Sequence, residues 1–493
     1  MLNRRTFVGI AAALAPAVSL SARAQEIDRW YEIWISGSRS GWSHETVTTE
    51  GDRVTTANEM RLTIGRADQN IEIATDTWFV ETTGGKPIEM RVRQQFGPVP
   101  VATAYEFRES DVLVRSEQGE VEKQTTMPLP EGEWLTPRAA ADYLRQRLTS
   151  GATEITIRTL DPSNGLALVT TTRRDIAPAD VEGPAGRVKG YTAKTRTKVG
   201  PNDIPSDECF DREGTLLRNE SSLGGMKMTM IASTRDRAML KADPAELMIS
   251  TFVKPDRRIA SPRSRTAAVF RISIAEGELP QIPGSAFQRA EMIDDRTALV
   301  RVNTRVREPA VDVDRAAHLA ATTYLDNDDE LIRQLAAQAV GGVPADDPPA
   351  QAEALRRFVH RHIKTKDLGV AFATASETAR SCEGDCSEHG VLLAAMLRAA
   401  GIPSRVVAGV VYVDEFAGEK GVFGYHMWTQ ALLGSGQEEA WVDLDPTLGA
   451  DTAFDATHIA FATSRLDEGE AMGSLSAIAP LLGTLEIKVE EIE

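Results

Sequence analysis

The chain has 493 residues, 42% of them hydrophobic, and a formal net charge of −17. A chain of this length exceeds what one hydrophobic core accommodates, so two or three domains are expected. The acidic surplus disfavours nucleic acid and anionic lipid as partners, because both are themselves negatively charged.

Residues 1–24 have the pattern of a targeting segment. Arg4 and Arg5 precede Phe7, an apolar run follows, and Ala22-Arg23-Ala24 is a suitable cleavage site. Paired arginines with Phe two positions beyond indicate export through the twin-arginine pathway, and hence the periplasm. Asn3 precedes the arginines, where the twin-arginine pattern usually has Ser, so ordinary secretion remains open. The apolar run is too short to span a bilayer, and no later run is long enough, so no membrane span is predicted.

Two β-rich domains are predicted next, over residues 25–245 and 246–312. The first consists of β-prone runs separated by turn signals such as Gly84-Gly85 and Asn164-Gly165. The second has Pro-containing loops between shorter β-prone runs. The first carries no motif with specific chemistry and is interpreted as a folded platform or a partner-binding module.

One helix is predicted inside the first β-rich domain. Thr136 is placed to cap it, Pro137 takes its first position and Gly151 ends it. Its predicted buried face consists of Tyr143, Leu144 and Leu148.

Residues 313–470 read as a mixed helical and β domain. Helices are predicted over 316–324, 331–340 and 352–363. The tail, residues 471–493, ends in an alternating run that predicts a last strand added to one of the β domains. The predicted class is therefore α+β multidomain, with antiparallel β-rich domains before a mixed C-terminal core.

The helix after Gly384 is the first element to suggest chemistry. Asp385 is placed to cap its start, Glu388 completes an acidic capping box, and Gly401 ends it. The apolar residues that follow recur at three- and four-residue steps and predict one buried face. Cys386 falls on the first turn, where the helix dipole favours a thiolate nucleophile. A small buried Cys in an ordinary packing role is the alternative.

Two alternating runs further on predict a β-hairpin. His426 lies in the first run and Asp445 at the end of the second. If the hairpin is centred on Ser435 and Gly436, these two residues are directly opposed, close enough for the carboxylate to hold the imidazole. A register error of two residues would substitute Asp443. Thiol, imidazole and carboxylate together are the groups of covalent acyl transfer.

The residues around these three positions also resemble a family. Gly-Asp-Cys386-Ser-Glu-His, Tyr-His426-Met-Trp428 and Trp-Val-Asp-Leu-Asp445-Pro-Thr are similar, in order and spacing, to the transglutaminase-like superfamily. The resemblance extends over roughly residues 325–464. It implies a papain-like fold with Cys386 as nucleophile, His426 as general base and acid, and Asp445 as orienter. Ser387 follows the cysteine where eukaryotic transglutaminases have Trp, which groups this sequence with the bacterial branch.

Four further residues are supporting candidates for this site. One of them, His389, also belongs to a set that could form a metal site instead. The supporting candidates are Asp385, Asp443, Trp428 and His389. Cys382, Cys386, His389 and His426 could in principle bind zinc as a Cys₂His₂ set. Cys386 and His389 lie on one helical turn and no second tight pair exists, so no metal and no cofactor is predicted. The three cysteines are an odd number, and Cys209 and Cys382 are expected to be free or bridged.

Three functions remain open at this stage. Hydrolysis of an amide or peptide bond through a thioester is favoured, with a protein or peptide as substrate. Transfer of the acyl group to an amine would make the chain a cross-linking enzyme. A non-catalytic envelope scaffold or binding protein is the third reading, and the presence of all three triad residues argues against it.

Overall fold

The computed structural model describes residues 24–493, apart from 68, 97–98, 119–120, 201, 276, 312, 367–371 and 468–475. The predicted targeting segment, residues 1–24, lies outside the described residues except for Ala24. Within the described ranges, no helix is both long and apolar enough to cross a membrane. Strands hold 49% of the described residues and helices 18%, so this part of the chain is mostly β and the predicted α+β class fits it only loosely.

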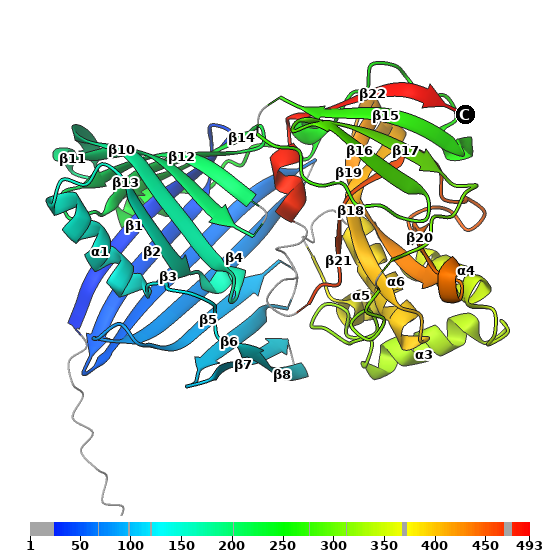
Figure 1. Ribbon diagram of the computed structural model, residues 1–493, viewed down its shortest axis with the longest axis horizontal. Helices are drawn as coiled ribbons and strands as arrows, with labels where there is room; N and C mark the ends of the chain where they lie inside the picture. The colour runs from blue at the N-terminus through cyan, green and yellow to red at the C-terminus, as the bar shows by residue number, and fades with distance from the viewer. Residues whose placement is uncertain are drawn as a thin grey trace, which may run out of the picture.

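The N-terminal half forms one large antiparallel sheet (Figure 1). In the described part of the chain it has fourteen strands, in the order β8-β7-β6-β5-β4-β3-β2-β1-β14-β13-β12-β11-β10-β9. These are β1 (Ala24–Ile35), β2 (Ser38–Glu50), β3 (Arg53–Arg66), β4 (Gln69–Thr82), β5 (Pro87–Gln95), β6 (Val101–Phe107), β7 (Asp111–Gln118), β8 (Val121–Pro128), β9 (Ile155–Leu160), β10 (Leu168–Gly183), β11 (Gly186–Val199), β12 (Asn202–Asp211), β13 (Leu216–Leu223) and β14 (Met226–Ser233).

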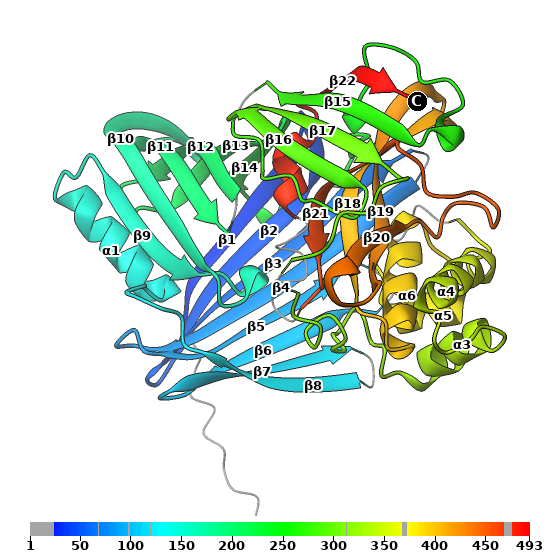
Figure 2. The same ribbon diagram turned by 45° about the vertical axis from the view of Figure 1, so that its right-hand side comes forward.

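The large sheet curls back on itself rather than lying flat (Figure 2). Leu160, at the end of β9, packs into one apolar cluster with Phe79 of β4 and Met90 of β5. The short helix η1 (Pro162–Asn164) contacts β4 and β5 as well. Strands far apart in the sheet order are thus brought together, and they bury one face of the sheet.

The predicted helix of this region is α1 (Pro137–Thr149). Leu144 and Leu148 are buried as expected, but Tyr143 is 37% exposed and does not belong to the buried face. Thr136 precedes the helix without capping it, since its hydroxyl donates to Glu81 of β4. The carboxylate of Glu81 also accepts from the Arg138 backbone N–H at 2.8 Å. A strand residue therefore supplies the acceptor that the helix start requires.

A second antiparallel sheet has four described strands in the order β16-β17-β15-β22. They are β15 (Ala267–Ile274), β16 (Gln288–Asp294), β17 (Thr297–Asn303) and β22 (Leu485–Ile492). β22 is the predicted last strand, and it pairs with β15. The short helices before and after this sheet are α2 (Arg235–Ala238), η2 (Ile249–Thr251), η3 (Pro262–Ser264) and η5 (Ser476–Leu481).

The remaining part combines helices with a third sheet, in the described order β20-β19-β18-β21 (Figure 2). Its elements are α3 (Glu330–Val340), α4 (Pro348–His362), α5 (Ala375–Ser381), α6 (Cys386–Ala399), β18 (Ser404–Phe416), β19 (Glu419–Leu433), η4 (Gly436–Glu438), β20 (Ala440–Leu444) and β21 (His458–Ser464). The start of β18, at Val406 and Ala408, packs against the helices. Its continuation, at Val410 and Tyr412, packs against the second sheet.

Two of the three helices predicted before α5 form, and one does not. The predicted helices over 331–340 and 352–363 correspond to α3 and α4. Residues 316–324 form turns instead. The backbone N–H of Ala317 is bound by the Asp314 side chain, and the backbone N–H of Ser404 donates to the His318 carbonyl. The first of these bonds is a local cap, and the Ala320 N–H still donates to the Ala316 carbonyl, so the segment makes a turn that does not continue as a helix.

Gly409 is the position where the third sheet tolerates no side chain. A Cβ there would lie 2.1 Å from the Ile459 carbonyl oxygen and 2.6 Å from the Trp428 ring. We expect Gly409→Ala to lower the free energy of unfolding by about 1–3 kcal/mol or more, because the backbone of β21 and a buried indole would have to move. Thermal and urea unfolding measure it. Gly342→Ala, with no atom within 4 Å of the new Cβ, is the matched control and should change stability little. Equal stability of the two variants would contradict this packing.

Candidate active site

The start of helix α6 is built as the sequence predicts. The Asp385 carboxylate accepts from the Ser387 backbone N–H at 2.8 Å, and the Glu388 carboxylate accepts from the Asp385 backbone N–H at 2.9 Å. The prediction of one buried face is wrong, because every residue from 387 to 398 is buried. Helices α3, α4 and α5 and strands β18 and β19 all contact α6. Cys386 thus opens a central helix.

Cys386 as a whole residue is half-buried, with its thiol turned inward toward strand β19. It is hydrogen-bonded to the backbone of Met427, the residue that follows His426. Helix and strand are in close contact here, since the Thr429 hydroxyl donates to the Gly390 carbonyl at 2.8 Å. The cysteine and the histidine-bearing strand are therefore brought together.

The sequence predicts a lowered pKa for the Cys386 thiol, whereas its surroundings raise this pKa. Burial raises the pKa of the thiol, and the Asp385 carboxylate raises it further. Arg66 and the Met427 backbone act in the opposite direction. The resting thiol is accordingly neutral, and the helix start alone does not produce a thiolate.

His426 and Asp445 are paired, although not in the predicted register. The His426 Nε2–H donates to Asp445 Oδ2 at 2.8 Å. In the ladder between β19 and β20, Gln430 pairs with Asp443 and Thr429 with Leu444. Direct opposition of His426 and Asp445 would need a register two residues away from this one. The shift arises because the short helix η4 lengthens the second half of the connection between the strands. Asp445 follows the end of β20 and reaches the imidazole from there.

Asp445 is 1% exposed, and its carboxylate is fully engaged. Oδ1 accepts from the Thr447 backbone N–H at 2.8 Å and from its hydroxyl at 2.7 Å. Burial alone would raise its pKa, but the two imidazoles of His426 and His458 hold the pKa well below its usual range. The carboxylate is therefore ionised.

His458 is the functional candidate that sequence reasoning missed. It begins β21, is fully buried, and its Nε2–H donates to Asp445 Oδ2 at 3.2 Å. Its Nδ1 lies 3.5 Å from Asp455 Oδ1. Burial lowers the pKa of His458, but the carboxylates of Asp455 and Asp445 outweigh it and raise the pKa to about 9. His458 is thus a buried imidazolium between two carboxylates.

A repeated local pattern in the sequence could have pointed to this second histidine. Asp455 accepts from the backbone N–H and hydroxyl of Thr457, as Asp445 does from Thr447. Two Asp-x-Thr turns ten residues apart therefore orient two carboxylates in the same way. His458 comes directly after the second turn.

The four supporting candidates have different positions. Asp443 lies beside the pair rather than in it, accepting from Trp428 Nε1 at 2.8 Å and from the Gln430 amide at 2.7 Å. The Trp428 ring stacks near the His426 ring, with centroids 5.9 Å apart. His389 is buried and donates from Nδ1 to the Asp385 carbonyl at 2.6 Å. Asp385 caps the helix.

The zinc set considered from the sequence does not form a cluster among the described residues. Cys382 Sγ instead lies 3.5 Å from His362 Nε2, and all three cysteines carry free thiols. The ligand atoms of His426, Asp445 and His458 do lie within 4.8 Å of one another. Both imidazoles donate to the same Asp445 oxygen, so hydrogen bonding accounts for this grouping.

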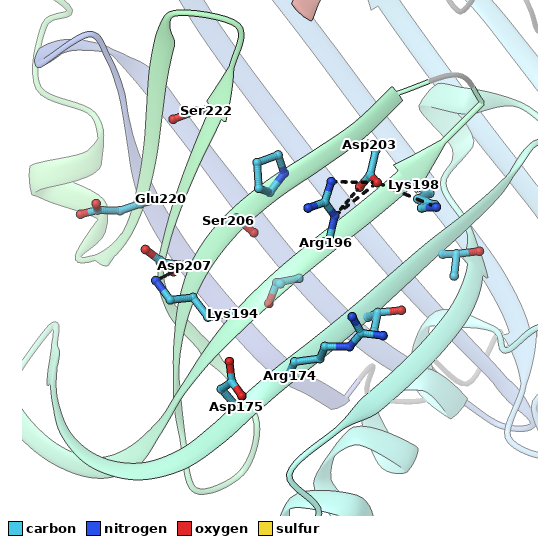
Figure 3. A pocket seen from close by; sticks show the side chains of 14 residues that line it. Arg174, Asp175, Lys194, Arg196, Lys198, Asp203, Ser206, Asp207, Glu220 and Ser222 are labelled. Carbon is cyan, nitrogen blue, oxygen red and sulfur yellow. Dashed lines mark hydrogen bonds and ion pairs between the residues drawn. The ribbon is translucent and has the colours of Figure 1, made fainter. Parts of the chain in front are cut away.

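A polar hollow of about 820 Å³ lies elsewhere, on the face of β10–β13 (Figure 3). Its basic side chains are paired with carboxylates, Lys194 with Asp207 at 2.6 Å and Arg196 with Asp203 at 3.0 Å. Arg174, also on its lining, is paired with Glu154. These ion pairs engage the basic side chains of Arg174, Lys194 and Arg196.

Comparison with known proteins supports the family resemblance. Residues 333–446 match the family model of the transglutaminase-like superfamily, a segment that includes Cys386, His426 and Asp445. The resemblance is thereby confirmed for this part of the chain, and it indicates a family of thiol enzymes. Comparison with curated proteins gave no match.

Two solved structures show weak likeness. A β-barrel-like protein from Brucella abortus, a domain of unknown function, has a TM-score of 0.32 and 12% identity, covering 42% of this chain and 95% of its own. The periplasmic domain of TgpA from Pseudomonas aeruginosa, bound to ethylmercury, has a TM-score of 0.24 and 19% identity, covering 38% of this chain and 91% of its own. At these scores neither likeness bears on function.

The charged state of His458 predicts an alkaline loss of stability. Its folded pKa of about 9 lies above the ordinary value of 6.5, so its contribution is complete below about pH 6.5 and is lost as the pH rises through 9. His458→Gln should cost about 3–5 kcal/mol at pH 6 and flatten the decline between pH 6.5 and 9. Urea unfolding at a series of pH values measures both effects.

His318→Gln is the control for this prediction, because burial lowers the pKa of His318. It should alter the pH dependence only on the acid side. An alkaline slope that is unchanged in His458→Gln would rule out the imidazolium.

Proposed function

We propose that this chain is an exported thiol enzyme that cleaves amide or peptide bonds through Cys386, His426 and Asp445. The observation that carries the proposal is the 2.8 Å hydrogen bond between His426 and the buried carboxylate of Asp445, on the strand whose Met427 backbone is in contact with the Cys386 thiol. Thiol, base and orienting carboxylate are the groups that acyl transfer requires. Export is part of the proposal, and Arg4, Arg5 and the apolar run after them support it.

In the first half of the reaction, the Cys386 sulfur attacks the carbonyl carbon of the amide. Because Nε2–H of His426 donates to Asp445, Nδ1 is the nitrogen that can accept the thiol proton. The carbonyl oxygen becomes an oxyanion, and the Cys386 backbone N–H at the helix start is proposed as one donor to it. His426 then gives its proton to the nitrogen of the departing amine, which leaves a thioester on Cys386.

Water completes the cycle in the second half. His426, again neutral, accepts a proton from the water as its oxygen attacks the thioester carbonyl. The C–S bond breaks, the carboxylic acid leaves, and the proton returns from His426 to the Cys386 sulfur. An amine in place of water would give transamidation by the same steps.

Because the resting thiol is neutral, His426 has to act as a general base. Since burial and Asp385 raise the pKa of Cys386, the proton has to move to His426 during the attack. The imidazolium that forms is stabilised by the ionised Asp445. Asp445 keeps its charge and position through Thr447 and His458.

Removing any of the three groups should abolish most of the activity. Cys386→Ala is expected to eliminate both iodoacetamide labelling at this position and amide hydrolysis, because no nucleophile remains. His426→Ala and Asp445→Asn should each lower kcat by about 10³–10⁴-fold or more while the protein stays folded. Peptide mass spectrometry and hydrolysis of an amide library measure these effects. Cys382→Ser is the matched thiol control and should retain activity. An unreactive Cys386 in the wild-type protein would favour the scaffold reading.

The products distinguish hydrolysis from cross-linking. A glutamine-containing peptide incubated with the protein and a primary amine should yield cleaved or deamidated product, with the amine adduct in the minority. Mass spectrometry separates the three products, and Cys386→Ala provides the background. A dominant amine adduct would assign transamidation instead, on the same three residues.

A further inference from the structure

A residue of the large N-terminal sheet lies at the start of the cysteine helix. Arg66 is the last residue of β3, and its Nη2 is 2.5 Å from Asp385 Oδ2. The side chain of Asp385 is 6% exposed and that of Arg66 is 22% exposed. Asp385 is the N-cap of α6 and the direct neighbour of Cys386. The ion pair therefore joins the N-terminal sheet to the candidate active site.

The turn that carries Arg66 is held firmly. The Gly65 backbone N–H donates to the Ala245 carbonyl at 3.2 Å, and the Leu247 N–H donates to the Gly65 carbonyl at 3.0 Å. The Glu246 carboxylate accepts from the Ala67 backbone N–H at 3.0 Å. A Cβ on Gly65 would lie 2.8 Å from the Ala245 carbonyl oxygen. The segment that leaves the sheet thus clamps the turn, and Arg66 is fixed toward α6.

Several charged or titratable groups face the Cys386 thiol. Asp385 and Glu388, on its own helix, both raise the pKa of the thiol, whereas Arg66, from β3, lowers it. His389 of α6 is bonded to the Asp385 carbonyl, and His426 precedes Met427, the residue of β19 whose backbone is in contact with the thiol. Arg66 is thus a cation placed against the carboxylate that most opposes ionisation of the thiol.

We propose that Arg66 is a positioning residue of the catalytic site, contributed by the N-terminal sheet, which neutralises Asp385 beside Cys386 and so allows the thiol to lose its proton. The inference rests on the proposed function, because it takes Cys386 to be the nucleophile. It makes the N-terminal sheet a part of the active site rather than a platform. Reactivity of the thiol then depends on the sheet remaining docked.

Two other contacts between the same sheet and the C-terminal part provide controls. Gln118 of β7 donates from its amide to Glu377 at 2.8 Å. Lys123 of β8 donates to the Thr322 carbonyl at 2.7 Å. Neither is among the groups that shift the pKa of Cys386. Loss of either contact weakens docking without changing the charge beside the thiol.

The test measures alkylation of Cys386 by iodoacetamide in the full chain, from about pH 6 to pH 10, with peptide mass spectrometry to separate it from Cys209 and Cys382. Arg66→Gln should raise the apparent pKa of the reaction by about one unit or more and slow alkylation near pH 7.5 by about tenfold. Arg66→Lys keeps the positive charge and should restore part of the rate. Lys123→Gln and Gln118→Ala should leave the pH profile unchanged, even where they lower the Tm.

Asp385→Asn provides a second measurement, since Asn also caps helices and carries no charge. In that background Arg66→Gln should have little further effect on the pH profile. A profile of Arg66→Gln that superimposes on wild type, or an equal shift in Lys123→Gln, overturns the inference while the wild-type protein still cleaves amides. A wild-type Cys386 that neither alkylates nor supports hydrolysis overturns the proposed function itself.

Discussion

The buried carboxylate of Asp445 is the interaction on which the candidate site depends. It follows β20, yet it accepts hydrogen bonds from His426 in β19 and from His458 in β21, strands that β18 separates in the sheet. A carboxylate withdrawn from water is costly unless it is paired and hydrogen-bonded. Here Oδ2 meets two imidazoles and Oδ1 meets Thr447, which offsets that cost. The same contacts fix the position of the His426 ring relative to Asp445 and His458.

The balance of charges at Cys386 shows why position on a helix is not enough to predict a thiolate. A helix N-terminus stabilises a negative charge by at most about 2 kcal/mol, or roughly one and a half pKa units. Burial shifts a titratable group by up to about 3–5 units. For Cys386 burial is the larger effect, and the capping carboxylate of Asp385 adds to it. Under the proposed function, deprotonation of the thiol is assigned to His426, with Arg66 offsetting the charge of Asp385.

Local features of the site could be read from the sequence, whereas its long-range features could not. The capping box of α6 follows from spacing over a few residues, and the alternation of two nearby runs places His426 and Asp445 in one hairpin. The register was predicted two residues away from the observed one, because the geometry of the η4 turn is not encoded in strand alternation. His458 comes from β21, on the far side of β18, and the Asp-x-Thr turn before it orients Asp455 without indicating that the His458 ring reaches Asp445. The curl of the large sheet is likewise set by contacts such as Leu160 with Phe79, since alternation is the same in flat and curled sheets.

Asp385, at the start of helix α6, connects the C-terminal part of the molecule to the N-terminal sheet. Helix α6 needs an acceptor at its N-cap, and Ser, Thr or Asn would provide one without charge. The chain has Asp385 there, next to a thiol whose ionisation a carboxylate opposes. That arrangement is compatible with acyl transfer where a cation balances the carboxylate, and Arg66 forms an ion pair with it. Because Glu246 and Ala245 clamp the turn that bears Arg66, the charge beside Cys386 is tied to the geometry of the N-terminal sheet.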